Sequence, residues 1–511
     1  MGGVSATAGV PTVPIEPVSR RSALWAPHRR ATTVGMLLLI TLAAFEVMSV
    51  GTAMPTMVAD LHGEDLYAWP FTAFLAASVF GTVLAGRLSD TRGPWLPLFV
   101  GTALFGAGLV VAGAAPSMPV LLAGRVLQGA GGGMQIVVVY VLIAVVYPER
   151  ARPAVFGAVS AAWVLPALVG PAVAGLVTEH LGWRWIFTGL APFVLVAVVL
   201  LIPLARTLPA GPVSSVGPTS QAGPAGDQRA VEVQRPAGSQ RPAGSQRAAG
   251  GERAAGRRGL IAAALAAAVG LSALAWAAQH PRLATVPLAV AGLVLLVPSL
   301  RRLLPPGTVT GRRGLPSVVQ ARGLLAGAFF GVEAYLPLTL TAVHGTSPAL
   351  AGLPLTVGAL GWALASAMQG RYPDYPRELL LRGGFLLLAA GLGGTTVAAL
   401  SAVPYWLVLP TWAAAGAGMG LAMPSVSVRL LELSPPGDRG FNSAALQIWD
   451  MLLSAACIGL GGVLLAAIAS AAAPAPAVLV LDPLLAGLAL LGAVLASRTA
   501  VPGGPVTLEG K

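Results

Sequence analysis

Residues 33–55 read TVGMLLLITLAAFEVMSVGTAMP, an apolar run in which Glu46 is the only ionisable residue. The hydrocarbon core of a bilayer is about 30 Å thick, and a helix rising about 1.5 Å per residue crosses it in about 20 residues. The run therefore predicts a transmembrane helix. Because residues 1–32 contain no long apolar stretch, we expect no cleavable signal peptide, and this span would itself act as an uncleaved membrane anchor.

The rest of the 511-residue chain has the same apolar character. Hydrophobic residues make up 56% of it and charged residues 10%, whereas a soluble domain carries about 25% charged residues. Such a chain cannot cover itself with polar surface, which excludes coiled coils, disordered regulators and cytosolic enzymes. The net charge of +12 reflects a general arginine bias and gives no reason to expect a nucleic-acid partner. The single cysteine, Cys457, excludes a disulfide framework and a cysteine metal cluster.

Further apolar runs of suitable length follow, and together they predict an all-α polytopic membrane protein with fourteen spans in groups of six, two and six. We place the spans at 33–55, 70–88, 97–115, 119–146, 154–177, 186–205, 259–279, 283–300, 320–342, 348–370, 380–400, 404–430, 442–469 and 478–497.

The order of the spans divides the chain into six segments. They are an N-terminal tail (1–32), a six-helix bundle (33–205), a linker (206–258), two extra helices (259–300), a second six-helix bundle (320–497) and a C-terminal tail (498–511). The linker is rich in Pro, Gly, Ser and Gln and repeats QRPAGS, so we expect a disordered tether. The two extra helices contain no internal charge, and we expect them to be lipid-facing spacers.

The distribution of basic residues predicts the orientation in the membrane. With the N-terminus in the cytoplasm, 28 basic residues, Arg322 among them, fall on the cytoplasmic side, and two, Arg184 and Arg282, fall outside. Cytoplasmic loops of membrane proteins carry an excess of Lys and Arg. We therefore expect a multi-pass protein of the cytoplasmic membrane with both termini in the cytoplasm.

A short polar loop follows the second span and reads GRLSDTRG over residues 86–93. Its glycines, Gly86 and Gly93, allow a tight turn. Asp90 lies close to Arg92 in the sequence and can hold two helix ends together electrostatically. Taken alone, the loop is equally typical of an ordinary solvated connection.

Two spans contain residues that are unusual inside a membrane. Arg125 lies a few residues inside the outer boundary of the fourth span, where a cation is costly unless it is paired or lines water. The fifth span contains residues that allow a helix to bend and to approach its neighbours closely. These residues are Pro166, Gly170, Pro171 and Gly175.

These motifs, in this order, resemble those of the major facilitator superfamily, and within it the fourteen-spanner drug:proton antiporters. Residues 86–93 resemble the family's loop motif G-x-L-a-D-r-x-G-r-k, and the fifth span resembles its antiporter motif g-x-x-x-G-P-x-x-G-G. EVMSVGTAMP, at 46–55, is similar to the first-helix motif D-x-T-x-V-N-V-A-L-P. The chain departs from these patterns, with Glu46 in place of Asp, Thr91 after Asp90, and Pro166 in place of a Gly.

The resemblance implies the major facilitator fold, with two six-helix halves and two extra helices between them. It also implies alternating access, in which the halves rock around a site near the membrane midplane. The implied activity is export of hydrophobic or cationic drugs or metabolites, driven by the proton gradient without a cofactor or metal. The expected partners are a small lipophilic substrate, protons and the bilayer, and we expect a monomer.

Three carboxyls lie near the middle of predicted spans: Glu46, Glu333 and Asp450. The spans of Glu46 and Glu333 correspond in the two halves. Removal from water disfavours the charged form of a carboxyl, so we expect these groups, with Arg125, to couple transport to protons. We expect Gln at either Glu to abolish export and to spare expression. The alternative is a carboxyl paired permanently with Arg125 or with hydroxyls.

Four aromatic residues within spans could stack on a lipophilic ligand, although packing explains each of them equally well. They are Trp163, Tyr335, Trp362 and Trp449. Asp482 precedes Pro483, which is typical of a helix start, and we expect a structural role for it. A proton symporter or a uniporter for a nutrient is the alternative function. We find no clustered catalytic residues and no P-loop pattern, so we expect neither an enzyme nor ATP-driven transport.

Overall fold

The structure is a computed structural model, and it describes residues 25–27, 29–148, 151–207, 243–371, 375–435 and 438–499. In these ranges the secondary structure is helical and includes no strand, which confirms the all-α prediction. Fourteen of the described helical segments are long and apolar enough to cross a membrane. The predicted number of spans is therefore confirmed.

The helices of the first half follow the predicted order, and two spans include a short helical turn as well as a long helix. They are α2 (Arg30–Asp60), η1 (Glu64–Leu66), α3 (Trp69–Arg92), α4 (Trp95–Gly113), α5 (Met118–Val146), α6 (Arg152–His180), α7 (Arg184–Thr188) and α8 (Ala191–Thr207). A hairpin follows, made of α9 (Ala243–Gln279), η4 (Leu283–Thr285) and α10 (Val286–Leu303). Because α9 begins at Ala243, it includes residues that we assigned to the linker, and 208–242 lie outside the described residues.

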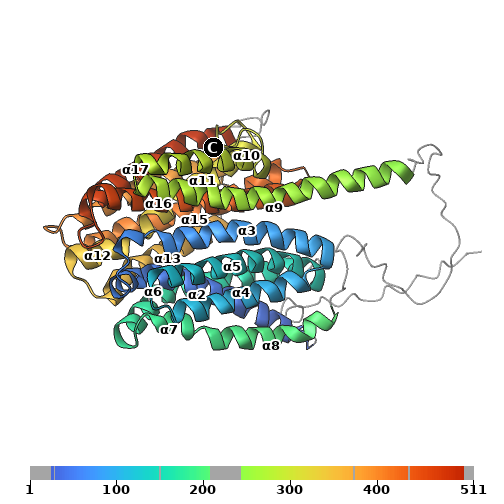
Figure 1. Cartoon of the computed structure of the whole chain (residues 1–511), viewed down its shortest axis with the longest axis horizontal. Coiled ribbons are helices and arrows are strands. Elements are labelled where there is room, and N and C mark those ends of the chain that lie inside the picture. Colours follow the sequence, from blue (N-terminus) through green and yellow to red (C-terminus); the bar gives the residue numbers. More distant parts are fainter. Residues whose placement is uncertain are drawn as a thin grey trace, which may run out of the picture.

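The second half again contains six spans. Its elements are α11 (Leu315–Glu333), α12 (Leu336–His344), α13 (Pro348–Arg371), α14 (Arg377–Thr395), η5 (Thr396–Ala399), η6 (Tyr405–Leu407), α15 (Val408–Leu433), α16 (Arg439–Ile468), α17 (Ala475–Leu495) and η7 (Ala496–Thr499). In Figure 1 the blue and teal helices of the first half lie on one side and the yellow to red helices of the second half on the other. The green hairpin lies beside the second half.

The bundle has two ends, which we name by what lies there. The linker end is where α2 begins, α3 ends and α9 begins, and the distal end is where α7 and α12 lie (Figure 1). Arg184 and Arg282, the two basic residues predicted to lie outside, are both at the distal end. The placement of the helices therefore follows the alternation that the loop charges predicted.

The ninth span, predicted as one helix over 320–342, is broken in the structure between α11 and α12. Pro337 lies in the first turn of α12. A proline has no N–H to donate to the carbonyl four residues earlier and its ring clashes with that carbonyl, which here belongs to Glu333. The helix therefore breaks directly after a candidate proton-coupling residue.

Glycines bring the second and fourth helices of each half into close contact. A Cβ atom added at Gly133 of α5 would collide with the backbone carbonyl of Ser78 in α3. In the second half, a Cβ atom at Gly416 of α15 would collide with the carbonyl of Gly358 in α13. Small residues allow such backbone approach between membrane helices. The same pair of helices is therefore joined by the same means in both halves.

The two halves meet along contacts near the distal end, which we call the distal seam. A Cβ atom at Gly175 of α6 would overlap the Cα of Ala349 in α13, and one at Gly352 would lie 2.8 Å from the carbonyl oxygen of Pro171. Nearby, the Tyr67 hydroxyl donates to the carbonyl oxygen of Ala334 at 2.8 Å. Gly175 is near the distal end of α6, Ala349 and Gly352 are at the distal start of α13, and Tyr67 lies between η1 and α3. The halves are thus closed against each other at this end.

The hairpin differs from the predicted pair of spacers because α9 contacts both halves at the distal seam. The Trp69 indole of α3 donates to Gln279 of α9 at 2.9 Å. A Cβ atom at Gly462 of α16 would lie 2.8 Å from the amide nitrogen of the same Gln279. In α10, by contrast, Leu293 and Val294 are exposed. The expectation that both helices are spacers therefore fails for the distal end of α9, whereas for α10 it stays a prediction.

Candidate functional site

The ionisable residues predicted to couple transport to protons occupy three places in the described spans. Glu46 and Arg125 form an ion pair in the first half, and Arg322 and Asp450 form another in the second half. Glu333 lies at the end of α11 and forms no ion pair with any residue that the structure describes. The three predicted carboxyls therefore have three different surroundings.

Arg125 is bound from three helices. Its Nη1 donates to Glu46 of α2 and, at 2.8 Å, to the Oε1 of Gln128 on its own helix α5. Its Nε donates to the carbonyl oxygen of Pro70 at 3.0 Å, and the guanidinium lies 4.4 Å from the centre of the Phe74 ring, both in α3. Such partners offset the cost of burying a cation. The guanidinium therefore joins α2, α3 and α5.

Glu46 is completely buried, and its second carboxyl oxygen is unbonded. Within the described ranges, Glu46 Oε2 has no hydrogen-bond partner, and the hydroxyls of Ser49 and Thr52 on the same helix are also without a partner. Buried polar groups are nearly always bonded to protein or to water. One oxygen thus binds Arg125 while the other remains able to accept a proton or a water molecule.

Glu333 differs from the other two predicted carboxyls because it has no arginine partner among the described residues. It is partly exposed where α11 ends, and for its Oε2 the described part of the chain offers no hydrogen-bond partner. Phe329 and Phe330 precede it by about one helical turn. A carboxyl with neither a cation nor a donor beside it can gain or lose a proton without breaking an ion pair.

An aromatic cluster lies beside the helix that bears Glu333. The Phe329 ring stacks on Trp412 of α15 with ring centres 4.8 Å apart, and its edge contacts Trp362 of α13 at 5.7 Å. Trp412 is completely buried, whereas Trp362 is partly exposed. We predicted Trp362 from the sequence and missed Phe329 and Trp412. The spacing of Phe329 and Glu333, four residues apart on one helix face, was the available signal.

Asp450 is paired with Arg322, which corrects our assignment of that arginine to a cytoplasmic loop. The Arg322 Nε donates to Asp450 Oδ2 at 2.6 Å, and its Nη2 lies 3.5 Å from Gln447 Oε1. Because α11 begins at Leu315, Arg322 is two turns inside the helix. The apolar run at 320–342 had suggested a later start.

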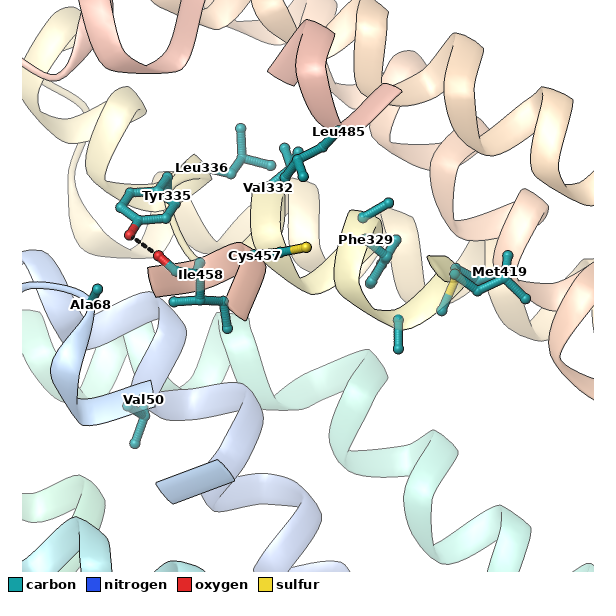
Figure 2. Packing of buried hydrophobic residues seen from close by; sticks show 14 of the residues in the cluster. Val50, Ala68, Phe329, Val332, Tyr335, Leu336, Met419, Cys457, Ile458 and Leu485 are labelled. Carbon is teal, nitrogen blue, oxygen red and sulfur yellow. Dashed lines mark hydrogen bonds between the residues drawn. The ribbon is translucent and has the colours of Figure 1, made fainter. Parts of the chain in front are cut away.

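The other predicted aromatic residues differ in their environments. Tyr335 is buried and donates its hydroxyl to the carbonyl oxygen of Ile458 at 2.5 Å (Figure 2). Trp449 is buried and donates its indole N–H to Gln320 at 2.8 Å. Trp163 of α6 is partly exposed. In this conformation, Tyr335 and Trp449 have structural partners, and Trp362 and Trp163 keep exposed ring surface.

The predicted gating loop is largely helical. Gly86, Asp90 and Arg92 lie on the last turns of α3, because the helix continues to Arg92. Gly93 then ends it with a φ of +84°, a backbone conformation that favours glycine. The loop prediction is therefore corrected for the first three residues and confirmed as a turn at Gly93.

The four predicted residues of the fifth span all lie in α6 and are buried: Pro166, Gly170, Pro171 and Gly175. A Cβ atom at Gly170 would lie 3.4 Å from Met48 of α2, while Pro171 and Gly175 contact α13 as described above. The motif therefore lies where α6 passes between α2 of its own half and α13 of the other.

Known proteins with similar sequences or folds are membrane transporters. The sequence profile of the Major Facilitator Superfamily matches residues 36–300, slightly more than half of the chain. A probable multidrug-efflux transporter of Mycobacterium tuberculosis is 28% identical over 80% of this chain and 82% of its own. An acurin A biosynthesis cluster transporter of Aspergillus aculeatus is 35% identical, but over only 32% of this chain and 30% of its own. The crystal structure of a D-xylose-proton symporter, 14% identical, shares the fold with a TM-score of 0.62 over 91% of this chain and 97% of its own.

Proposed function

Because this chain belongs to the Major Facilitator Superfamily and is a transporter, we propose that it exports lipophilic, cationic compounds in exchange for protons. The observation that carries the proposal is Glu333, a carboxyl without an ion-pair partner among the described side chains, which lies at the helix break about one turn after Phe329 of the aromatic cluster. The likeness to a probable multidrug-efflux transporter over most of both chains supports the direction of transport.

The proposed substrate class follows from the side chains near Glu333. The partly exposed ring of Trp362 offers a flat apolar surface, and its edge contact with Phe329 fixes its position. Aromatic faces attract cations, and desolvation strengthens that attraction. A lipophilic cation would place its charge at Glu333 and its apolar part against these rings.

The proposed coupling is competition for one carboxylate. A cation needs Glu333 in its charged form, whereas a proton neutralises it, so binding of one favours release of the other. Glu46 and Asp450 are each bound to an arginine, and changing their charge would disturb these pairs. Glu333 is therefore the residue that exchanges substrate for proton, and the two ion pairs respond to it.

We also propose that the linker end faces the cytoplasm. The ends of α2, α3, α10 and α16 at this side contain Arg30, Arg92, Arg301, Arg302 and Arg439. The excess of basic residues favours the cytoplasmic side. The described conformation, closed at the distal seam, is then closed to the exterior. A reporter fused at Gly510 that was active only outside the cytoplasm would contradict this orientation.

Transport by everted membrane vesicles tests the proposed function. We expect an acid interior to drive a fluorescent lipophilic cation into vesicles that contain the protein, because everted vesicles present the cytoplasmic side to the medium. The signal is expected to vanish when an ionophore collapses the pH gradient. Uptake that persists without the gradient would contradict antiport, and gradient-driven loss of dye from the vesicles would indicate symport.

The distal seam provides a second test, because alternating access requires it to open and close. A side chain at Gly175 would collide with Ala349, and overpacking of this kind costs about 1–3 kcal/mol. We expect Gly175→Leu to disfavour the closed seam by at least about tenfold, which corresponds to about 1.4 kcal/mol. Transport is expected to fall, and a cysteine placed at Ala349 is expected to react faster with an impermeant thiol reagent.

The matched control is Gly157→Leu in the same helix. A Cβ atom at Gly157 has no neighbour within 4 Å, so the same change in size and helix propensity is made without the collision. Normal transport is expected for this variant. Equal loss in both variants would show that the effect comes from α6 itself and not from the seam.

A further inference from the structure

Asp482 is a buried carboxyl to which the proposed transport cycle assigns no role. It is 2% exposed, and it lies seven residues after Ala475, the first residue of α17. At about 1.5 Å per residue, this position is about 10 Å from the distal end of the helix. Our interpretation of Asp482 and Pro483 as part of a helix start is therefore wrong, since Pro476 occupies the first turn instead.

A small pocket contacts this carboxyl from the side of the helix break. It lies between the junction of α11 with α12 on one side and α17 with η5 on the other, and its polar lining is Tyr335, Thr339 and Asp482. Val332 and Leu336 complete the wall next to the break, where Figure 2 shows them beside Tyr335. The pocket thus reaches residues that flank Glu333 in the sequence.

Asp482 has too few hydrogen-bond donors around it to stabilise a charged carboxylate. The Thr395 hydroxyl lies 2.6 Å from the carbonyl oxygen of Leu392 and 3.2 Å from Asp482 Oδ2. A hydroxyl has one proton, and a carbonyl can only accept. When the Thr395 hydroxyl donates its proton to Leu392 in the shorter bond, it can only accept from Asp482. The contact with Asp482 is then a hydrogen bond only if the carboxyl is protonated.

The other carboxyl oxygen, Oδ1, is buried and meets no donor within the described ranges. An ionised carboxylate with a free oxygen in an apolar environment is costly, and protonation removes that cost. A metal cation would need several free oxygens. Here the Tyr335 hydroxyl donates to Ile458 and the Thr339 hydroxyl to the carbonyl of Tyr335. A proton needs only one oxygen, which makes it the ligand that fits.

The ionisable groups on the surrounding elements do not neutralise Asp482. His344 of α12 contacts the outside of the pocket wall, because its Nε2 lies 2.9 Å from the carbonyl oxygen of Ala398, a lining residue. Cys457 of α16 contacts Gly327 and Gly331 of α11 instead. The remaining groups are Glu333 and Arg322 of α11, Asp450 and Arg439 of α16, Arg377, Glu378 and Arg382 of α14, and Arg498 of η7. Except for Glu333, the groups in this list lie in the halves of their helices that are nearer the linker end.

We infer that Asp482 is a second proton-binding site, whose carboxyl faces the small pocket beside the α11–α12 break. The inference rests on the proposed exchange of substrate for protons, because it gives the entering proton a first acceptor on the distal side.

Infrared difference spectroscopy of the purified protein tests the site without measuring transport. We expect the spectrum between acid and alkaline pH to contain a carbonyl band of a protonated carboxyl that Asp482→Asn removes and Glu333→Gln retains. A spectrum unchanged by Asp482→Asn would overturn the inference, since a permanently neutral structural carboxyl contributes no pH-dependent band. Failure of the vesicle experiment would overturn antiport and leave this titration unaffected.

A pair of variants at Thr395 provides a test that does not require replacement of the carboxyl. Thr395→Val removes the hydroxyl that the protonated carboxyl contacts, and losing a hydrogen bond of about 1 kcal/mol shifts the midpoint of a titration by about 0.7 pH unit. We expect the band to require a pH lower by about that amount in Thr395→Val and to be unchanged in Thr395→Ser. Equal titration in wild type and Thr395→Val would contradict the proposed contact.

Discussion

Glu333→Gln is expected to reduce gradient-driven transport to the level of vesicles without the protein, while the fold and expression are retained. Gln has the size and hydrogen-bonding shape of protonated Glu and cannot titrate. Because Glu333 has no ion-pair partner in the described part of the chain, the substitution leaves no opposing charge unpaired. The loss would therefore come from the missing proton exchange and not from instability.

The controls for this prediction use other carboxyls. Glu333→Asp keeps a titratable group with a shorter reach and is expected to retain partial transport. Glu64→Gln changes an exposed carboxyl in η1 and is expected to leave transport unchanged. Full pH-dependent transport by Glu333→Gln would remove Glu333 from the mechanism and direct attention to Glu46 and Asp450.

Glu46→Gln is expected to have the largest effect on stability, which differs from our expectation from the sequence that expression would be spared. The ion pair with Arg125 explains the difference, because Gln leaves that buried guanidinium without its counter-charge. Breaking a buried pair by removing one partner costs about 3–5 kcal/mol. We expect a lower midpoint of thermal unfolding in detergent and reduced expression.

The double variant Glu46→Gln, Arg125→Gln separates charge from packing. Removing both charges avoids an unpaired buried ion, so we expect most of the lost stability to return, although transport is not expected to recover. A double variant as unstable as Glu46→Gln alone would show that the pair does not dominate the energetics of this region.

The sequence predicted the arrangement of helices well because membrane spans depend on local properties. Length, hydropathy and loop charge are each visible in a single segment, and they were sufficient for fourteen spans and for the burial of Arg125. The pairing of Glu46 with Arg125 remained one of two alternatives, because these residues are 79 positions apart and their relative depth depends on exact helix boundaries.

The exact boundaries of the helices also explain why single residues were assigned wrongly. Arg322 was counted with the cytoplasmic loops because the predicted span begins only two residues before it, and a pair between Arg322 and Asp450 was therefore not among the alternatives considered. Asp482 was assigned to a helix start because it precedes a proline, although α17 begins two turns earlier. The contact between Gln279 and Trp69 links spans that are not adjacent in the sequence, so no local pattern could indicate it.

The most direct test of the central claim is proton release from purified protein when substrate binds. The protein is placed in weakly buffered detergent solution with a pH-indicating dye, and a lipophilic cation is added at saturating concentration. If substrate and proton compete for Glu333, the wild-type protein is expected to release protons when it binds substrate. The Glu333→Gln variant is expected to release fewer protons at the same substrate occupancy. Equal proton release by both proteins, or substrate binding without release by wild type, would contradict the account.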